Sequence, residues 1–242
     1  MSGRAPRPGP LSLDRGKDVF GSPLSRPGRG GWGRGLLAGD EGEPDALQRR
    51  LFDVGIATIG LVVFSPLLAV IALLIKLESP GPVFFKQKRV GKGGWLFDVH
   101  KFRSMRLAKP EEQTVPDVED IERFKFRPAN FERRVTAIGR AIRACSLDEM
   151  PNLLNVLKGD MHLVGPRPDE PELVAQYRPE YYGRFQVKPG ITGLAQINGR
   201  TDLTYQEIMA YDLDYVREHP FSRDIRIMLK SLGAVLRREG AR

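Results

Sequence analysis

One stretch limits the fold of this chain more than any other, because residues 54–75 read VGIATIGLVVFSPLLAVIALLI and carry no charged side chain. As an α-helix, these 22 residues would be about 33 Å long at about 1.5 Å per residue. The hydrocarbon core of a bilayer is about 30 Å thick, so a helix of this length and composition can cross it. The stretch therefore predicts a membrane-embedded helix.

The centre and the flanks of this stretch argue against a simple crossing. Ser65 and Pro66 lie at its middle, where a proline lacks the backbone N–H and kinks a helix, while the serine can satisfy a freed carbonyl. Basic residues stand on both sides: Arg49 and Arg50 before it, and Lys76, Lys86, Lys88 and Arg89 after it. Basic flanks tend to stay in the cytoplasm. The residues alone leave two alternatives open, a single transmembrane helix or a re-entrant helix that returns to the same side.

Residues 1–47 have the composition of a disordered tail. They hold 11 of the 26 glycines and 6 of the 19 prolines without apolar periodicity, so they cannot bury enough surface to offset their chain entropy. No apolar region follows the early charges, which argues against a signal peptide. We expect an inert tail, with contact between its arginines and anionic lipid as the alternative.

Charge and cysteine content limit the partners and the compartment. The chain of 242 residues has a formal net charge of +8, which suits nucleic acid, an anionic membrane or phosphorylated substrates without choosing among them. Its one cysteine, Cys145, excludes an intramolecular disulfide, fits a reducing compartment and is expected to be buried. The three histidines are far apart in the sequence and lack the spacing of a zinc site.

The remaining pattern predicts an α+β domain that is mostly helical. Residues 83–90 and 95–103 are short β-prone runs on either side of a GKGG segment, which predicts a β-hairpin. Apolar spacing predicts helices over residues 135–142 and 151–159. Residues 224–238 predict a basic amphipathic helix, which suits either the membrane surface or ordinary packing on the domain.

The residues with the clearest chemical content lie in the stretch RACSLDEMPNLLNVLKGDMHLVGPRP, which begins at Arg143. It contains an adjacent carboxylate pair, Asp148 and Glu149, and ends with Arg167 enclosed by two prolines. Carboxylates can attack phosphorus or hold a divalent cation, and arginines bind phosphate oxygens in pairs, so this combination suits a phosphate-handling site. The alternative for the acidic pair is an ordinary solvated helix start with Ser146 or Asp148 as N-cap.

This stretch resembles the signature of the bacterial sugar transferases, the small monotopic polyprenyl-phosphate glycosyl-1-phosphate transferases. An arginine, then Ser-Leu-Asp-Glu, Asn-Val-Leu-Lys-Gly-Asp-Met and Val-Gly-Pro-Arg-Pro, follow one another as in the family. Two further blocks match, GPVFFKQ at residues 81–87 running on to KFRSM at 101–105, and KPGITGLAQ at 188–196. The resemblance covers about residues 48–238.

The resemblance implies an architecture and a reaction. Residues 48–78 would form a re-entrant membrane helix with its kink at Ser65 and Pro66. Residues 79–242 would form a catalytic domain with the hairpin and amphipathic interfacial helices, on the cytoplasmic face of the bacterial inner membrane. A sugar 1-phosphate would pass from a nucleotide diphosphate sugar, expected to be a UDP-hexose, to undecaprenyl phosphate. UMP would be released, and the product would start an exopolysaccharide, O-antigen or other surface glycan.

The resemblance also implies roles for single residues. Asp148 would be the nucleophile that forms an aspartyl–phosphosugar intermediate, and Glu149 would hold Mg²⁺. Five basic side chains are candidates for substrate phosphates: Arg143, Arg167, Lys101, Arg103 and Lys188. Strand alternation is expected to point Lys101 and Arg103 to one face.

Other carboxylates carry weaker signals. Asp160 could support the metal or merely cap a turn. Asp212 and Asp214 imitate the Asp-x-Asp motif of nucleotide-sugar glycosyltransferases, but residues two apart on a helix do not share a face, so we assign them no metal role. His219 precedes a proline at an expected helix end, and we interpret it as structural.

Two hypotheses from other functional classes compete with the transferase. A membrane-anchored scaffold could keep the fold without the chemistry, but it would have no chemical need for Asp148, Glu149 and Arg167. A nucleic-acid binder would need a reading helix or an aromatic stacking platform, and none is recognisable, so we expect no nucleic-acid partner. The sugar, the glycan pathway and the oligomeric state, including a homodimer, stay open.

Overall fold

The computed structural model describes residues 45–106, 134–199 and 202–236, and the structural account is confined to them. The expected disordered tail therefore lies outside the described residues, apart from its last three. The described chain is mostly helical, with two small two-stranded sheets and one long apolar helix.

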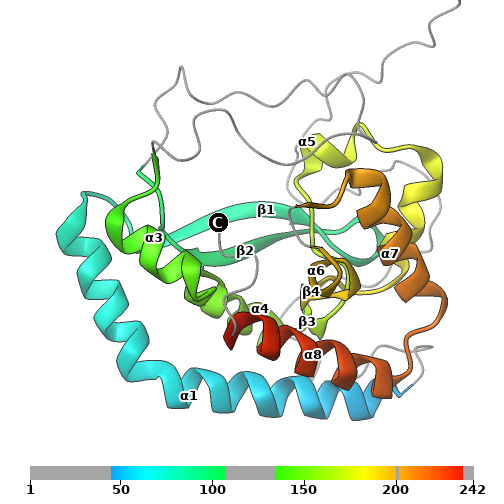
Figure 1. Ribbon diagram of the computed structural model, residues 1–242, viewed down its shortest axis with the longest axis horizontal. Helices are drawn as coiled ribbons and strands as arrows, with labels where there is room; N and C mark the ends of the chain where they lie inside the picture. Colours follow the sequence, from blue (N-terminus) through cyan, green and yellow to red (C-terminus); the bar gives the residue numbers. More distant parts are fainter. Residues whose placement is uncertain (1–44, 107–133, 200–201, 237–242) are drawn as a thin grey trace, which may run out of the picture.

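The apolar stretch lies within α1 (Ala46–Glu78), a single helix of 33 residues with Pro66 inside it. Among the described helices, α1 is the one long and apolar enough to cross a membrane. Figure 1 shows that α1 bends along its length, so that it has two arms. A proline is the usual cause of such a bend, and Ser65 Oγ donates to the carbonyl of Val62 at 2.8 Å. The bend agrees with the Ser-Pro pair in the sequence.

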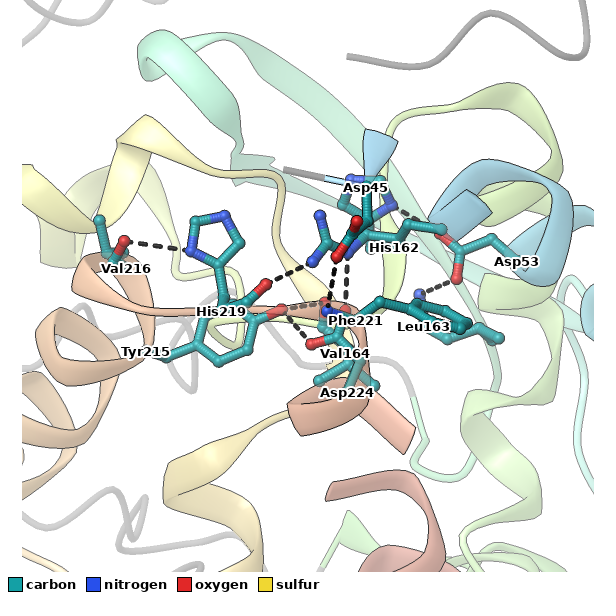
Figure 2. Close-up of polar contacts among 11 residues, drawn as sticks. Asp45, Asp53, His162, Leu163, Val164, Tyr215, Val216, His219, Phe221 and Asp224 are labelled. Atoms are coloured by element: carbon teal, nitrogen blue, oxygen red, sulfur yellow. Dashed lines mark hydrogen bonds and ion pairs between the residues drawn. The ribbon is translucent and has the colours of Figure 1, made fainter. Parts of the chain in front are cut away.

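The first arm of α1 is held to the domain by buried charges (Figure 2). Arg49 Nε donates to Asp224 Oδ2 at 2.6 Å, and Arg49 Nη2 donates to the carbonyl of His219 at 2.6 Å. Tyr215 OH donates to the other oxygen of Asp224 at 2.7 Å. The contacts join the start of α1 to α7 (Tyr205–Arg217) and α8 (Phe221–Leu236), and Figure 1 shows α8 alongside this arm. The ring of His219 lies against α7, with Nδ1 3.1 Å from the carbonyl of Val216.

Two more charged residues secure the same arm. Arg50 donates to the carbonyls of Val156 and Leu157 at 2.6 and 2.7 Å, at the end of α4 (Leu153–Lys158). Asp53 Oδ2 lies 2.5 Å from His162 Nδ1. Arg49 and Arg50 are only 2% and 4% exposed. These arginines, which the sequence suggested as a basic flank at the membrane surface, are thus used inside the protein.

The second arm of α1 is tied to the hairpin and to α3 (Ala137–Ala144). A small apolar cluster joins these elements: Ile71, Ile75, Phe102 and Ile142. The guanidinium of Arg103 donates to three carbonyls at the end of the helix, those of Ile75, Ser79 and Pro80, at 3.1, 2.7 and 2.6 Å. A helix end leaves such carbonyls without intrahelical partners, so Arg103 acts as their cap. Both ends of α1 are therefore fastened to one domain.

The predicted hairpin is confirmed. Strands β1 (Phe84–Val90) and β2 (Leu96–Phe102) pair antiparallel, with Phe84 opposite Phe102. A short turn, η1 (Lys92–Gly94), connects them. Gly93 and Gly94 have φ of 67° and 79°, a left-handed conformation that favours glycine and explains the GKGG segment.

The second sheet pairs β3 (His162–Val164) with β4 (Gly190–Thr192) in parallel. A Cβ on Gly190 would lie 2.1 Å from the backbone nitrogen of Gly165, so only glycine permits this approach. The pairing sets the KPGITG block beside the strand that leads into the Pro-Arg-Pro segment. The other elements are η3 (Leu147–Asn152), α5 (Pro171–Val174), η4 (Pro179–Gln186) and α6 (Leu194–Ile197).

The predicted C-terminal amphipathic helix corresponds to α8. Ile227 is buried in the main core, whereas Leu229 and Leu232 are 63% and 57% exposed. One side of α8 therefore packs on the domain, and the other side presents apolar side chains outward. The alternative of packing on the domain is confirmed, and a place at the membrane surface stays a prediction.

Candidate active site

A sharp turn places the acidic pair. Helix α3 ends at Ala144, and Ser146 takes a left-handed conformation with φ of 56° before η3 begins at Leu147. A non-glycine residue pays about 1–2 kcal/mol for this conformation. Asp148 and Glu149 fall in the first turn of η3, and no side-chain hydrogen bond from Ser146 caps it. Cys145 in this turn is exposed, so its expected burial is wrong.

Glu149 is the centre of a cluster of charges from three separate elements. Its Oε1 accepts from Lys101 Nζ of β2 at 2.8 Å and from Arg167 Nη2 at 2.6 Å. Its Oε2 accepts from Arg167 Nη1 at 3.3 Å, so Arg167 binds the carboxylate at two points. Arg167 follows β3 in the Pro-Arg-Pro segment, and its side chain is 47% exposed.

The two carboxylates differ in their electrostatics. Burial raises the pKa of Asp148, and the charge of Glu149 raises it further. Three cations, Lys101, Arg143 and Arg167, act to lower this pKa but do not outweigh the rise. Burial also acts to raise the pKa of Glu149, but Arg167 and Lys101 outweigh it and hold this pKa well below its ordinary range. Within the part of the chain that the structure describes, Asp148 has no hydrogen-bond or ion-pair partner. Its carboxylate is therefore the one open to a substrate.

A small cavity adjoins this cluster, with about 270 Å³ of empty volume. Four charged side chains line it: Arg89, Lys101, Glu149 and Arg167. Three of the four charges are positive. The cavity thus suits an anionic group such as a phosphate.

Arg89 is a site residue that sequence reasoning missed. It donates to the carbonyl of Pro168 at 3.3 Å and lies 3.2 Å from Glu170 Oε1. Burial lowers its pKa, although Glu170 and Asp169 act to raise it. The only signal in the sequence is its position two residues after the GPVFFKQ block, near the end of the first predicted strand.

The structure places the other predicted phosphate ligands differently. The charge of Arg143 contributes to the pKa of Asp148, which puts Arg143 within electrostatic reach of that carboxylate. Arg103 is 3% exposed, and its guanidinium caps α1. Lys101 contacts Glu149 instead, so the two residues have different partners, although the N–H of Arg103 still donates to the carbonyl of Val83 just past the end of β2.

Lys188 and Asp160 lie together, next to α4. A Cβ on Gly159 would lie 3.9 Å from Lys188 Nζ. Burial raises the pKa of Asp160, while an Asn155 hydrogen bond and the charges of Lys158 and Lys188 lower it. Asp160 Oδ2 accepts from Asn155 Nδ2 at 3.3 Å. This placement associates Lys188 with Asp160.

Asp212 and Asp214 have separate partners. Asp212 is buried, with its Oδ2 2.7 Å from Arg184 Nη2, whereas the exposed Asp214 accepts from Arg223 Nη2 at 2.5 Å. The two carboxylates point to different neighbours, as their spacing on a helix predicted.

The acidic pair contains Glu149, the residue that is expected to hold Mg²⁺. Among the described residues, no group of three His, Cys, Asp or Glu side chains could hold a metal ion. Mg²⁺ needs only one or two carboxylates when substrate phosphates and water complete its shell. Glu149 meets this need, provided that Arg167 turns from Glu149 toward the substrate, and the half-exposed side chain of Arg167 has the room. The donor set therefore fits.

Comparison with known proteins agrees with the residues that form the site. The model of the family described as bacterial sugar transferase matches residues 45–238. The UDP-glucose:undecaprenyl-phosphate glucose-1-phosphate transferase of Caulobacter vibrioides is 42% identical over 204 residues, which are 81% of this chain and 72% of that protein. The undecaprenyl-phosphate galactose phosphotransferase of Salmonella typhimurium is 38% identical, over 80% of this chain and 41% of its own length.

A third relative has nearly the size of the matched region. The exopolysaccharide production protein ExoY of Rhizobium meliloti is 36% identical, over 81% of this chain and 88% of its own length. The chain thus spans most of the Caulobacter and Rhizobium relatives and less than half of the Salmonella protein. The matched segment contains α1, the hairpin, the acidic pair and Arg167. The chain belongs to the bacterial sugar transferase family.

Proposed function

We propose that this protein is a membrane-bound phosphoglycosyl transferase that moves a sugar 1-phosphate from a UDP-hexose to undecaprenyl phosphate. The observation that carries the proposal is the unpartnered carboxylate of Asp148 beside a cluster of cations, in a chain of this family. The printed names of two relatives describe the transfer of glucose 1-phosphate and of galactose phosphate to undecaprenyl phosphate. The product would start a surface glycan.

In the first step, a carboxylate oxygen of Asp148 attacks the phosphorus that carries the sugar. A bond forms between that oxygen and phosphorus, the bond from phosphorus to the bridging oxygen of the pyrophosphate breaks, and UMP leaves with the electron pair. Arg167, Lys101 and Arg89 neutralise phosphate oxygens, because they line the adjoining cavity. Asp148 must be ionised to attack, so its raised pKa makes the reaction fail in acid.

In the second step, an oxygen of undecaprenyl phosphate attacks the same phosphorus. The bond between phosphorus and Asp148 breaks, the carboxylate is regenerated, and the sugar is left on an undecaprenyl diphosphate. Arg143 approaches Asp148 from α3, the helix that packs on the second arm of α1. We therefore assign Arg143 to the phosphate of the lipid, which arrives along the membrane helix.

Glu149 would hold Mg²⁺ together with the donor phosphates. When bound, the ion neutralises charge on the pyrophosphate and on the departing UMP. Lys101 keeps Glu149 in place from the other side, because its Nζ lies 2.8 Å from Oε1.

We propose that α1 is re-entrant and that the domain lies on the cytoplasmic side of the inner membrane. Its first arm is held by Arg49 and its second by Arg103, and both contact the same domain. A domain cannot stand on two sides of a bilayer, so both ends of α1 lie on one side. Each half of the apolar stretch is about 17 Å long, which reaches only partway through the bilayer.

Apolar side chains around the bend supply the contact with lipid. Several are 60% exposed or more, with nothing packed over them: Ile59, Val62 and Val63. Figure 1 shows α8 beside the first arm, and this helix carries two more exposed leucines, Leu229 and Leu232. Exposed apolar area of this kind in a family of lipid-modifying enzymes favours burial in a bilayer.

The reaction is tested by UMP release. The full chain in detergent or nanodiscs is incubated with Mg²⁺, undecaprenyl phosphate and, one at a time, UDP-glucose, UDP-galactose and their N-acetylated forms. We expect UMP with one donor, its loss in Asp148→Asn and after chelation with EDTA, and no change in the matched control Asp214→Asn. A folded protein that releases no UMP with any donor would contradict the proposal and favour the scaffold.

The topology is tested by cysteine labelling in a Cys145→Ser background. Gln48→Cys and Lys76→Cys place single thiols at the two exposed ends of α1. We expect a membrane-impermeant maleimide to label neither in intact spheroplasts and both after lysis. Labelling of one thiol in intact spheroplasts would show a transmembrane crossing.

A further inference from the structure

Arg184 is a buried arginine that lies behind the Pro-Arg-Pro segment. Its side chain is 2% exposed, and Nη2 donates to the carbonyl of Arg167 at 2.6 Å. The same nitrogen lies 2.7 Å from Asp212 Oδ2, and Nη1 donates to Asp169 and to Tyr177 OH. One guanidinium thus joins η4, α7 and the segment that carries Arg167.

The neighbours of Arg184 leave it no other position. Asp169 accepts from Tyr177 OH at 2.6 Å and from Tyr205 OH, so three donors converge on one carboxylate. The guanidinium carbon lies 5.9 Å from the ring centroids of Tyr177 and Phe185. A buried network with several shared hydrogen bonds is rigid, because each displacement breaks more than one of them at once.

This network fixes the backbone on which the proposed phosphate ligand stands. The rings of the flanking prolines restrict φ on both sides of Arg167. Their own carbonyls are also held, one by the N–H of Gly190 at 2.9 Å and the other by Arg89 Nη1 at 3.3 Å. Arg184 holds the carbonyl between them. Only the side chain of Arg167 can then move, from Glu149 to the substrate.

The stability of the core gives a weaker account of these charges. Two carboxylates and one arginine lose their hydration when buried, and apolar replacements of similar volume are often as stable. The hydrogen bond from Arg184 to the Arg167 carbonyl has no such replacement, because an apolar side chain cannot donate. What apolar side chains could not replace in this network is therefore the hydrogen bond from Arg184 to the Arg167 carbonyl.

We propose that Arg184 is a positioning residue that holds Arg167 in register with Asp148 and Glu149. The proposal rests on the proposed function, because the position of Arg167 matters to the reaction only if Arg167 binds donor phosphate. Arg184 does not touch the substrate, and it acts through Arg167 alone.

The test is a double-mutant cycle in the full chain. UMP release is measured for Arg184→Gln, Arg167→Ala and the double variant, with the donor that serves the wild type. We expect Arg184→Gln to raise KM for the donor at least tenfold and to have no further effect once Arg167 is alanine. Arg223→Gln, which removes an arginine that pairs with Asp214 on the surface, should leave KM and kcat unchanged.

Hydrogen–deuterium exchange supplies a readout that does not need activity. In Arg184→Gln, the peptide that spans residues 165–170 should exchange faster, while peptides of α4 and β2 keep the wild-type rate. Tyr205→Phe removes one hydrogen bond to Asp169 with little change of shape and should show the same effect in smaller degree. It carries the test if Arg184→Gln does not fold.

Three outcomes would overturn the positioning role. They are independent losses in the cycle, an unchanged exchange rate at residues 165–170, and a rise in exchange spread evenly over the domain. If the wild type releases no UMP with any donor, the proposed function fails. The exchange experiment still decides whether Arg184 fixes the segment.

Discussion

Arg167 grips Glu149 at two points, with Nη2 2.6 Å from Oε1 and Nη1 3.3 Å from Oε2. Asp148, the residue directly before Glu149, receives no such contact from the described residues. The two adjacent acids therefore have different environments. Glu149 is paired with two cations, which lower its pKa, whereas burial and the charge of Glu149 raise the pKa of Asp148. This asymmetry supports the proposed roles, with Asp148 as the nucleophile and Glu149 as the supporting carboxylate.

Asp148→Asn is expected to stabilise the protein at neutral pH. The folded state raises the pKa of Asp148 above its ordinary 3.8, so above that pH the ionised carboxylate destabilises the fold. Removing the charge should add about 1 kcal/mol, or about 2–4 °C in Tm for a chain of this size. Thermal unfolding without Mg²⁺ at pH 7.5 and near pH 4 checks it, since the gain should shrink in acid. A lower Tm at pH 7.5 would contradict the repulsion inferred here.

Glu149→Gln is expected to act in the opposite direction. Arg167 and Lys101 outweigh burial and lower the pKa of Glu149, so its charge stabilises the fold at neutral pH. The amide would leave Lys101 without its carboxylate, at a cost of about 1–3 kcal/mol. Urea unfolding at pH 7.5 measures the change. Equal stability of the wild type and the variant would show that the ion pairs contribute nothing net.

Asp212 is expected to make the stability depend on pH. Burial raises its pKa from 3.8 to about 7, although Arg184 partly offsets the effect. The folded state therefore holds a proton that the unfolded chain releases between these values, and the contribution of this group to stability falls as pH rises from about 4 to 7. Asp212→Asn should remove that decline. If the free energy of unfolding changed with pH in the same way for the variant and the wild type between pH 5 and 8, the raised pKa of Asp212 would be contradicted.

Arg103→Gln and Lys101→Gln are expected to separate stability from binding. Arg103 caps the end of α1, so its loss leaves carbonyls unsatisfied and should cost about 1–3 kcal/mol with little change in KM for the donor. Lys101→Gln should raise KM, because Lys101 lines the cavity. Unfolding curves and donor titrations of both variants give the comparison. A large KM effect of Arg103→Gln in a stable protein would restore it as a phosphate ligand.

Local signals in the sequence were sufficient for the hairpin and for the long apolar helix. The glycines with positive φ in the GKGG turn give the hairpin, and Pro66 in an apolar stretch gives the bent helix. The acidic pair and Arg167 were found because their motif is long and ordered. These features depend on residues close together in the chain.

Contacts between distant residues were not predictable in the same way. Arg103 donates to carbonyls at the end of α1 that lie 23 to 28 positions earlier in the chain, and nothing near it in the sequence indicates these contacts. Arg49 meets Asp224 across 175 positions, and nothing near either residue indicates the pair. In the sequence, Arg184 resembles any surface arginine. Only the fold brings Tyr177, and Asp212 of α7, next to it.

The most direct test of the account is capture of the covalent intermediate. The wild type, Asp148→Asn and Asp214→Asn are incubated with Mg²⁺ and the productive UDP-sugar but without undecaprenyl phosphate, and their peptides are analysed by mass spectrometry. We predict a sugar phosphate on Asp148 in the wild type and in Asp214→Asn, with UMP released in an amount equal to the protein, and neither in Asp148→Asn. Steady UMP release that requires the lipid from the outset, with an unmodified Asp148, would contradict the aspartyl intermediate.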